Sequence, residues 1–377
     1  MIGRVLAAGG LAVACTLWPV AAHAAPPECA PERGKVTISS NLWAQQRLDI
    51  RSAWRLTAGK GVTVAVIDSG VDVKHPQLKI AGKADFSRTT SRDCEGHGTA
   101  VAGIIGAQFR NDFPFYGVAP QSRLLALKHA NGKRGDVAHL VEAIQYAAKI
   151  GVDVINISAQ AADQPDLKAA IDYALAQDVV VVAAAGNADK SDGTPGPAYP
   201  AAYEGVLSVG ALAPDGRISD FSNTGSKVSV VAPGQGLTST WPGGTYKTDL
   251  PGTSFAAPYV AGVAALVRAR FPDLNQEQVR RRIEATADGG LGTGTGTGTV
   301  NPVAAVSTIL PAEEVVVAPP RPEPLPPGVV AKRPEPDERA ITVAVWVGAG
   351  ALVLAGALVA ARVVMPMGRR RGWRPGS

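Results

Sequence analysis

Residues that bind metal ions are scarce in this chain of 377 residues. It has five histidines and three cysteines, and none of their spacings is typical of a zinc site. It also has no aspartate-rich loop of the kind that binds calcium in EF-hands. We therefore expect no cofactor, although a structural calcium ion at an irregular site would leave no spacing pattern.

A basic surface for nucleic acid is lacking as well. Lysine and arginine number 37 against 32 aspartates and glutamates, which gives a net charge of +5. Arginines near the two ends inflate this excess, and the central region has no basic stripe. We therefore expect no nucleic-acid partner.

Three short motifs with the side chains of a serine hydrolase stand in the order aspartate, histidine, serine. A serine hydroxyl is a poor nucleophile at neutral pH, but an imidazole can take its proton while a carboxylate fixes the imidazole tautomer. Each motif has glycine beside or near the reactive residue, which suits a tight turn at the end of a strand or the start of a helix. The motifs are Val-Ile-Asp68-Ser-Gly, Gly-His97-Gly-Thr and Gly-Thr-Ser254-Phe-Ala-Ala-Pro.

Each motif also has an interpretation without chemistry. Asp68 after an apolar run is typical of a strand that ends in a turn, and Ser254 at a helix start is a preferred capping residue. The capping and catalytic interpretations of Ser254 are compatible, because the positive end of the helix dipole favours negative charge that develops there. Three such motifs in one chain leave little room for coincidence, so we interpret the chain as a serine hydrolase.

These motifs, together with a fourth, closely resemble the subtilisin-like serine proteases (subtilases). Their order is that of subtilisin, whereas chymotrypsin-like enzymes and α/β-hydrolases use other orders. The fourth motif is Ala-Ala-Ala-Gly-Asn187, and the resemblance runs from about Trp43 to Ala305.

The resemblance implies a role for each of these residues. Asp68 would orient His97, His97 would move the proton, and Ser254 would attack a peptide carbonyl. The side chain of Asn187 and the backbone N–H of Ser254 would form the oxyanion hole. Subtilases often bind calcium at irregular sites, which the sequence does not reveal.

The resemblance also implies two extended segments that pair with the backbone of a peptide substrate. The matching stretches are Lys133–Gly135 and Ser158–Gln160, which make Gly135, Ser158 and Ala159 candidate substrate-binding residues. The second stretch departs from the family, which usually has a Leu-Gly pair after the serine, whereas this chain has Ala-Gln. The sequence therefore predicts peptide-bond cleavage without a preferred side chain.

Short apolar segments alternate with helical patterns, which predicts an α/β fold with a mostly parallel sheet covered by helices. We expect the three-layer subtilisin-like fold plus one C-terminal transmembrane helix. Ligands of such open sheets gather beyond the carboxyl ends of the strands, where Asp68 and Asn187 are expected. The expected strands are Val62–Ile67, Arg123–Lys128, Asp153–Ser158 and Val179–Ala184, and the expected helices are His97–Ala107, Asp136–Ile150, Asp166–Gln177, Ser254–Arg270 (with Pro258 in its first turn) and Asn275–Ala287.

The two ends of the chain predict export and membrane anchoring. The first 24 residues have a basic residue, an apolar stretch and an Ala-x-Ala cleavage site, as in a signal peptide, with a lipoprotein at Cys15 as the alternative. Ile341–Ala361 is about as long as the roughly 20 apolar residues that cross a bilayer, and the arginines after it predict a cytoplasmic tail and an extracytoplasmic catalytic domain. The expected parts are a signal peptide (1–24), an N-terminal extension wrapping the catalytic domain (25–49), a protease domain (50–310), a proline-rich linker (311–340), a transmembrane helix (341–364) and a basic cytoplasmic tail (365–377).

The two cysteines outside the leader, Cys29 and Cys94, suit an exported protein. Exported chains can keep disulfides, and two cysteines allow a single pairing. A bridge would hold the extension against the rim of the site near His97, and two free thiols are the alternative.

The order of these parts along the chain resembles that of the mycosins, which are membrane-anchored subtilases of actinobacterial type VII secretion systems. The resemblance implies a serine endopeptidase at the cell membrane, with a peptide or protein substrate and the type VII membrane complex as partners. One alternative is a structural subunit that stabilises this complex with proteolysis dispensable, and another is an esterase or amidase. The complete set Asp68, His97, Asn187 and Ser254 favours the protease, because a scaffold has no physical need for all four.

Overall fold

The computed structural model describes residues 29–38, 42–131, 135–188, 196–290, 292–311 and 337–370. The chain divides into two compact units, residues 1–312 and 313–377. The predicted signal peptide, nearly all of the predicted linker and the end of the predicted tail lie outside the described residues, as do Lys133 and Arg134 of one predicted substrate-pairing segment.

A nine-stranded sheet forms the centre of the first unit. Its order is β10-β11-β7-β6-β5-β4-β1-β3-β2, and every neighbouring pair is parallel except β10 with β11. The central strands β4, β5 and β6 are buried along their whole length and are mostly apolar, as strands with helices on both faces of the sheet require. The strands are β1 (Thr63–Asp68), β2 (Ile80–Asp85), β3 (Arg123–Lys128), β4 (Val154–Ile157), β5 (Val180–Ala184), β6 (Leu207–Leu212), β7 (Val230–Pro233), β10 (Asp288–Gly289) and β11 (Gly298–Thr299).

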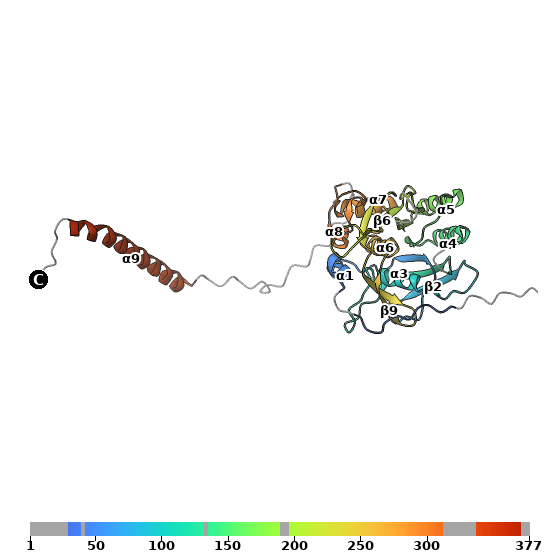
Figure 1. The fold of residues 1–377 in the computed structure, drawn as a ribbon, viewed down its shortest axis with the longest axis horizontal. Coiled ribbons are helices and arrows are strands. Elements are labelled where there is room, and N and C mark those ends of the chain that lie inside the picture. The colour runs from blue at the N-terminus through green and yellow to red at the C-terminus, as the bar shows by residue number, and fades with distance from the viewer. Residues whose placement is uncertain are drawn as a thin grey trace, which may run out of the picture. The chain divides into compact units, whose positions relative to one another are not determined.

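Helices α4 (Val137–Lys149) and α5 (Pro165–Ala176) cover one face of the sheet. Figure 1 draws them together in green. The buried side chains of α4 recur every three or four positions, as a helix with one apolar face requires. The Asp136 side chain accepts a hydrogen bond from the Ala138 N–H (2.9 Å), so this aspartate caps the helix and fixes where it begins.

The other face is covered mainly by α3 (His97–Gly106) and α6 (Thr253–Arg270). Helix α6 is buried on all sides over most of its length, which its alanines, valines and glycine permit because they let neighbouring elements approach closely. The mostly parallel, three-layer fold predicted for this unit is confirmed. The remaining helices of the described part of this unit are α1 (Trp43–Leu48), α2 (Ile50–Ala53), α7 (Gln276–Ala285) and α8 (Pro302–Ser307).

A separate antiparallel hairpin, β8 (Leu237–Trp241) with β9 (Thr245–Leu250), holds the beginning of the described chain. Lys35 and Tyr246 exchange two backbone hydrogen bonds of 2.7 and 2.8 Å. The indole N–H of Trp241 donates to the Glu32 carbonyl (2.6 Å). Helix α1, although it falls within the predicted extension, has three buried residues and joins the main core.

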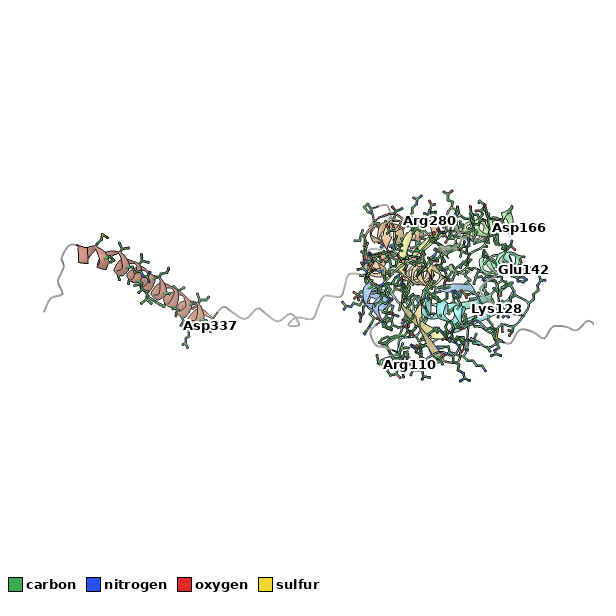
Figure 2. All side chains as sticks on the ribbon, in the orientation of Figure 1. Arg110, Lys128, Glu142, Asp166, Arg280 and Asp337 are labelled. Carbon is green, nitrogen blue, oxygen red and sulfur yellow. A yellow bond between two sulfur atoms is a disulfide. The ribbon has the colours of Figure 1, made fainter. Side chains whose placement is uncertain are left out.

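In the second unit, the structure describes residues 337–370, which include the long helix α9 (Glu338–Arg370). Asp337 lies at its start (Figure 2), and its carboxylate accepts hydrogen bonds from the N–H groups of Arg339 and Ala340. Its stretch from Glu338 to Val363 spans 26 residues and includes an 18-residue window with a mean hydropathy of 2.3. By length and composition, this stretch is a candidate to cross a membrane.

Candidate active site

Three elements bring the predicted catalytic side chains together at the carboxyl edge of the sheet. Asp68 is the last residue of β1, His97 the first of α3 and Ser254 the second of α6. The Nδ1 atom of His97 lies 2.8 Å from Asp68 Oδ1, and its Nε2 atom lies 2.9 Å from Ser254 Oγ. In the neutral enzyme, Nδ1–H donates to the carboxylate and the serine hydroxyl donates to Nε2, which leaves the imidazole ready to accept the serine proton.

Asp68 is positioned by a second hydrogen bond besides its contact with the imidazole. Its side chain is buried, and Oδ1 also accepts a hydrogen bond from the Ser69 N–H at 2.7 Å. The chain then turns back closely against α3. A Cβ atom on Gly98 would lie 2.0 Å from the Gly70 carbonyl oxygen and 3.0 Å from Asp68 Oδ1, so only glycine fits beside the histidine.

The surroundings of His97 favour its charged form. Burial lowers its pKa, but the charge and hydrogen bond of Asp68 raise it, with additions from Asp93 and Glu95, and the net direction is upward. The ring of Phe255 packs against the imidazole with a centroid separation of 4.8 Å. An imidazolium at this position is therefore stabilised by its surroundings.

Asp93 organises the start of α3 although no sequence motif marks it. One of its oxygens accepts from the Ser69 hydroxyl and from the N–H groups of Glu95 and Gly96. The other accepts from the N–H and hydroxyl of Thr99. A buried carboxylate at a helix start satisfies free N–H groups and suits the helix dipole, so Asp93 fixes the first turn that carries the histidine.

Ser254 is not the capping residue of its helix, because Gly252 takes that position. Pro258 lies at the sixth residue of α6, so the expectation that it occupies the first turn is wrong. A proline there has no N–H to donate to the carbonyl four residues earlier, which is that of Ser254. The Ser158 hydroxyl donates to this carbonyl instead, at 2.7 Å. The bond from Ser158 thus ties the end of β4 to Ser254.

The side chain of Asn187 is oriented by Thr253. Its Oδ1 atom accepts hydrogen bonds from the N–H and the hydroxyl of Thr253, both at 3.0 Å. This leaves the Nδ2 group free to donate. A Cβ atom on Gly252 would lie 3.0 Å from Ser254 Oγ and 3.7 Å from Asn187 Nδ2, which places the amide and the hydroxyl around one small space. The Ser254 N–H lies in the first turn of α6, where helical N–H groups have no partner within the helix.

The predicted substrate-binding residues lie on the two sides of this centre. Ser158 and Ala159 follow β4, whereas Gly135 is exposed just before α4. A Cβ on Gly135 would meet the ring of His129, which is buried and whose pKa is lowered chiefly by that burial. Within the described ranges, no group of three or more histidine, cysteine or carboxylate side chains is placed to hold a metal ion.

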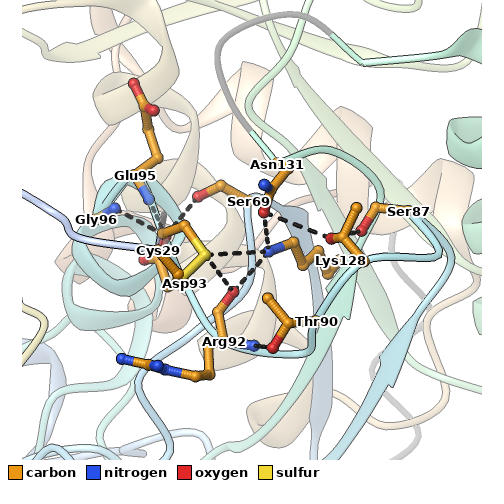
Figure 3. The surroundings of a disulfide bond; sticks show 12 residues. Cys29, Ser69, Ser87, Thr90, Arg92, Asp93, Glu95, Gly96, Lys128 and Asn131 are labelled. Carbon is orange, nitrogen blue, oxygen red and sulfur yellow. Dashed lines mark hydrogen bonds between the residues drawn. A yellow bond between two sulfur atoms is a disulfide. The ribbon is translucent and has the colours of Figure 1, made fainter. Parts of the chain in front are cut away.

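Cys29 and Cys94 form a disulfide next to this site (Figure 3). Cys94 follows Asp93 directly and stands three positions before His97. The buried ammonium of Lys128 donates to the carbonyl of Arg92 (2.6 Å), which steadies the same loop. The extension is therefore bonded covalently to the loop that begins the histidine helix.

Replacing both disulfide cysteines by serine is expected to lower the free energy of unfolding. The bridge closes a segment with a sequence separation of 65, and loss of such a constraint on the unfolded chain costs about 4 kcal/mol. Urea unfolding of the full-length chain in detergent measures the change. Ser307→Ala, on the surface at the end of α8, serves as the control, and equal unfolding midpoints for the two variants would contradict the expectation.

Comparisons with known proteins agree with this geometry. The model of the Peptidase S8 subtilase family matches residues 59–304. Subtilisin DY of Bacillus licheniformis is 41% identical over 61% of this chain and 84% of its own, and Mycosin-1 of Mycolicibacterium smegmatis is 35% identical over 81% of each chain. The crystal structure of MycP1 from the ESX-1 type VII secretion system superposes with a TM-score of 0.68 at 34% identity, covering 75% of this chain and 90% of that one. The chain belongs to the subtilase family of serine endopeptidases and is similar to the mycosins.

Proposed function

We propose that the chain hydrolyses peptide bonds through an acyl-enzyme formed on Ser254. The observation that carries the proposal is the continuous hydrogen-bonded line from Asp68 through His97 to the serine hydroxyl, with steps of 2.8 and 2.9 Å. Separations of this size are those at which a base can take a proton from its nucleophile.

The reaction runs in two halves. Ser254 Oγ bonds to the carbonyl carbon while its proton passes to His97 Nε2, and the carbonyl oxygen becomes an anion that accepts hydrogen bonds from Asn187 Nδ2 and the Ser254 N–H. The C–N bond then breaks and the leaving amine takes the proton from His97. Water attacks the ester in the second half, with His97 again as base, and releases the acid and the free serine.

Replacing Asn187 by alanine is expected to lower kcat by about 10²- to 10³-fold with KM nearly unchanged, the range known for the corresponding asparagine of subtilisin. The reason is that the amide interacts with the oxyanion more strongly than with the ground-state carbonyl. Steady-state kinetics on one peptide measure the effect, and Asn111→Ala on the exposed surface is the control. If KM rises and kcat does not change, Asn187 contributes to binding of the ground state instead.

The proposal also covers the setting of the enzyme. An exported protease held at the cell membrane by α9, with the catalytic unit outside and the basic tail in the cytoplasm, accounts for the apolar stretch of α9 and for the arginines that follow this stretch. A disulfide in the catalytic unit suits an oxidising compartment. We propose that neither metal nor organic cofactor takes part in the chemistry.

Similarity to MycP1 supports a role in type VII secretion, with a secreted protein as substrate and the membrane complex as partner. The hydrogen-bonded side chains favour catalysis over a purely structural subunit, because a scaffold does not need a serine aligned with a base. Esterase or amidase activity is the less favoured alternative, because the segments predicted to pair with the substrate backbone suit a peptide better than a small ester.

Two experiments test the proposal. The purified full-length chain, given a peptide library, is expected to cleave internal peptide bonds, whereas the Ser254→Ala variant is not. In cells, secretion is compared between a Ser254→Ala strain and a deletion strain. A defect in both strains supports a catalytic role in secretion, and a defect only on deletion contradicts it.

A further inference from the structure

A pocket of about 900 Å³ lies beside the loops that lead from Asp68 and to His97. Its volume is within the range of roughly 300–1,000 Å³ that is typical of ligand sites. It contains none of the catalytic residues, although it begins three positions after Asp68 and ends four before His97 along these loops. The residues that line it are Lys83 of β2 and those of four segments, 31–34, 71–74, 91–93 and 242–245.

Hydrogen bonds hold the walls of the pocket in place. The N–H of Gly243 in the turn between β8 and β9 donates to Asp72 Oδ2 at 2.8 Å. The ammonium of Lys83 donates to the Ser91 hydroxyl at 3.0 Å. The disulfide fixes the N-terminal extension beside the loop that precedes α3. The pocket is therefore formed before a ligand arrives, so that binding does not have to order its walls.

Four cationic side chains of the pocket have no carboxylate partner. They come from the extension, the loop after β1, strand β2 and the loop before α3, and all four are exposed. None of them forms an ion pair with any of the described residues. The guanidinium of Arg92 points away from Lys128 and the disulfide (Figure 3). The four cations are Arg33, Lys74, Lys83 and Arg92.

The carboxylates that line the pocket, by contrast, are already engaged. Glu32 Oε2 lies 2.6 Å from the ammonium of Lys247. Asp72 accepts hydrogen bonds from backbone N–H groups of its own loop and of the turn between β8 and β9. Both oxygens of Asp93 accept hydrogen bonds at the start of α3. A ligand therefore meets free donors on the cations, which favours an anion.

The arrangement suits several anionic groups on one chain better than a single small anion. The cations stand on four separate segments around the pocket, so each can serve a different group of the ligand. A protein substrate supplies such a ligand, because a chain bound at Ser254 continues on both sides of the cleaved bond. Its more distant residues can reach the loops next to Asp68 and His97.

We propose that this pocket is an exosite, which binds an acidic segment of the protein substrate away from the bond that is cleaved. The inference rests on the proposed function and adds a recognition site to it. The guanidiniums of Arg33 and Arg92 can pair with carboxylates through two parallel hydrogen bonds, whereas Lys74 and Lys83 act as point charges. Exposed ion pairs are screened by salt, so binding weakens as the ionic strength rises.

The kinetic test uses the full-length chain in detergent and three peptides that share one cleaved sequence. One peptide has no tail, and the others carry a run of glutamates behind a flexible spacer, at the N-terminal end in one and at the C-terminal end in the other. The native chain is expected to show about tenfold higher kcat/KM for one tailed peptide through a lower KM, as a few exposed ion pairs would give. This advantage should vanish in about 1 M NaCl. Equal kcat/KM for the three peptides at low salt overturns the proposal.

A double variant, Lys74→Gln with Arg92→Gln, tests whether the pocket is responsible. It should remove most of the ratio between the tailed and the untailed peptide. Lys60→Gln with Lys149→Gln removes the same charge from exposed positions before β1 and at the end of α4, so this control should keep the ratio. An equal loss in both double variants would show attraction by the overall charge and overturns the proposal.

Two further measurements keep the test decisive. If the double variant does not fold, Arg92→Glu is used, which should lower the ratio for the glutamate tail and raise it for a lysine tail, and unchanged ratios overturn the proposal. Binding of a fluorescent glutamate peptide to the Ser254→Ala chain, measured by anisotropy, does not depend on cleavage. Absence of cleavage by the folded native chain refutes the proposed function, whereas absence of this binding at low salt refutes the exosite.

Discussion

Replacing Ser254 by alanine is expected to lower kcat for peptide cleavage by about 10⁶-fold, the scale known for loss of the corresponding serine in subtilisin. Without the hydroxyl, His97 has no proton to accept and no acyl-enzyme forms. The remaining rate comes from water attacking a carbonyl that Asn187 and the Ser254 N–H, now carried by alanine, still polarise.

The fold should tolerate this substitution well. Ser254 Oγ bonds only to His97 among the described residues, and its backbone carbonyl keeps the bond from Ser158. Kinetics and thermal unfolding are therefore measured together, with Ser307→Ala as the control for loss of a hydroxyl elsewhere. Cleavage at more than a hundredth of the native rate by the folded variant would show that another nucleophile is at work.

Replacing Asp68 by asparagine is expected to lower kcat by about 10⁴-fold, as the same change does in a chymotrypsin-like triad. The asparagine side chain has the same shape as aspartate, but its amide group can donate to Nδ1 of His97. It thereby favours the tautomer whose proton is on Nε2, which cannot accept the serine proton. The anion that stabilises the imidazolium is also lost. Asp112→Asn is the control, because Asp112 lies on the surface in an exposed ion pair with Arg110.

The same variant, Asp68→Asn, is also expected to shift the pH dependence of kcat/KM. The proton acceptor is neutral His97, so kcat/KM rises with pH through the pKa of this imidazole. Asp68 raises that pKa. Its loss should therefore shift the acidic limb to lower pH while the plateau falls. A limb that stays in place would mean that Asp68 does not set the charge state of His97.

The residues that the structure brings together, Asp68, His97 and Ser254, could be predicted because each lies at or near the end of an element with a local signature. Asp68 ends an apolar strand, and His97 and Ser254 stand beside glycines at helix starts, so short stretches of sequence define them. The strands β1, β3, β4 and β5 were likewise predictable to within a residue or so, because they are mostly buried on both faces and form nearly continuous apolar runs in the sequence.

The supporting residues could not be predicted, because their roles depend on contacts made only in the folded chain. Asp93 lies in a loop without a motif, yet it accepts hydrogen bonds from N–H groups at the start of α3. Pro258 leaves the Ser254 carbonyl without its helical donor, and Ser158, which follows β4 nearly a hundred residues earlier in the chain, donates to this carbonyl instead. The pocket lined by the four cations is formed by segments far apart in the sequence, so no local pattern marks it.

Labelling with a fluorophosphonate tests most directly whether the carboxylate, imidazole and hydroxyl work as one unit. An activated serine oxygen attacks the phosphorus of the reagent and displaces fluoride. Peptide mass spectrometry then locates the adduct. The account predicts a single adduct on Ser254 in the native chain and its loss in His97→Ala. An unlabelled native protein that is fully folded, or equal labelling after the histidine is removed, would contradict it.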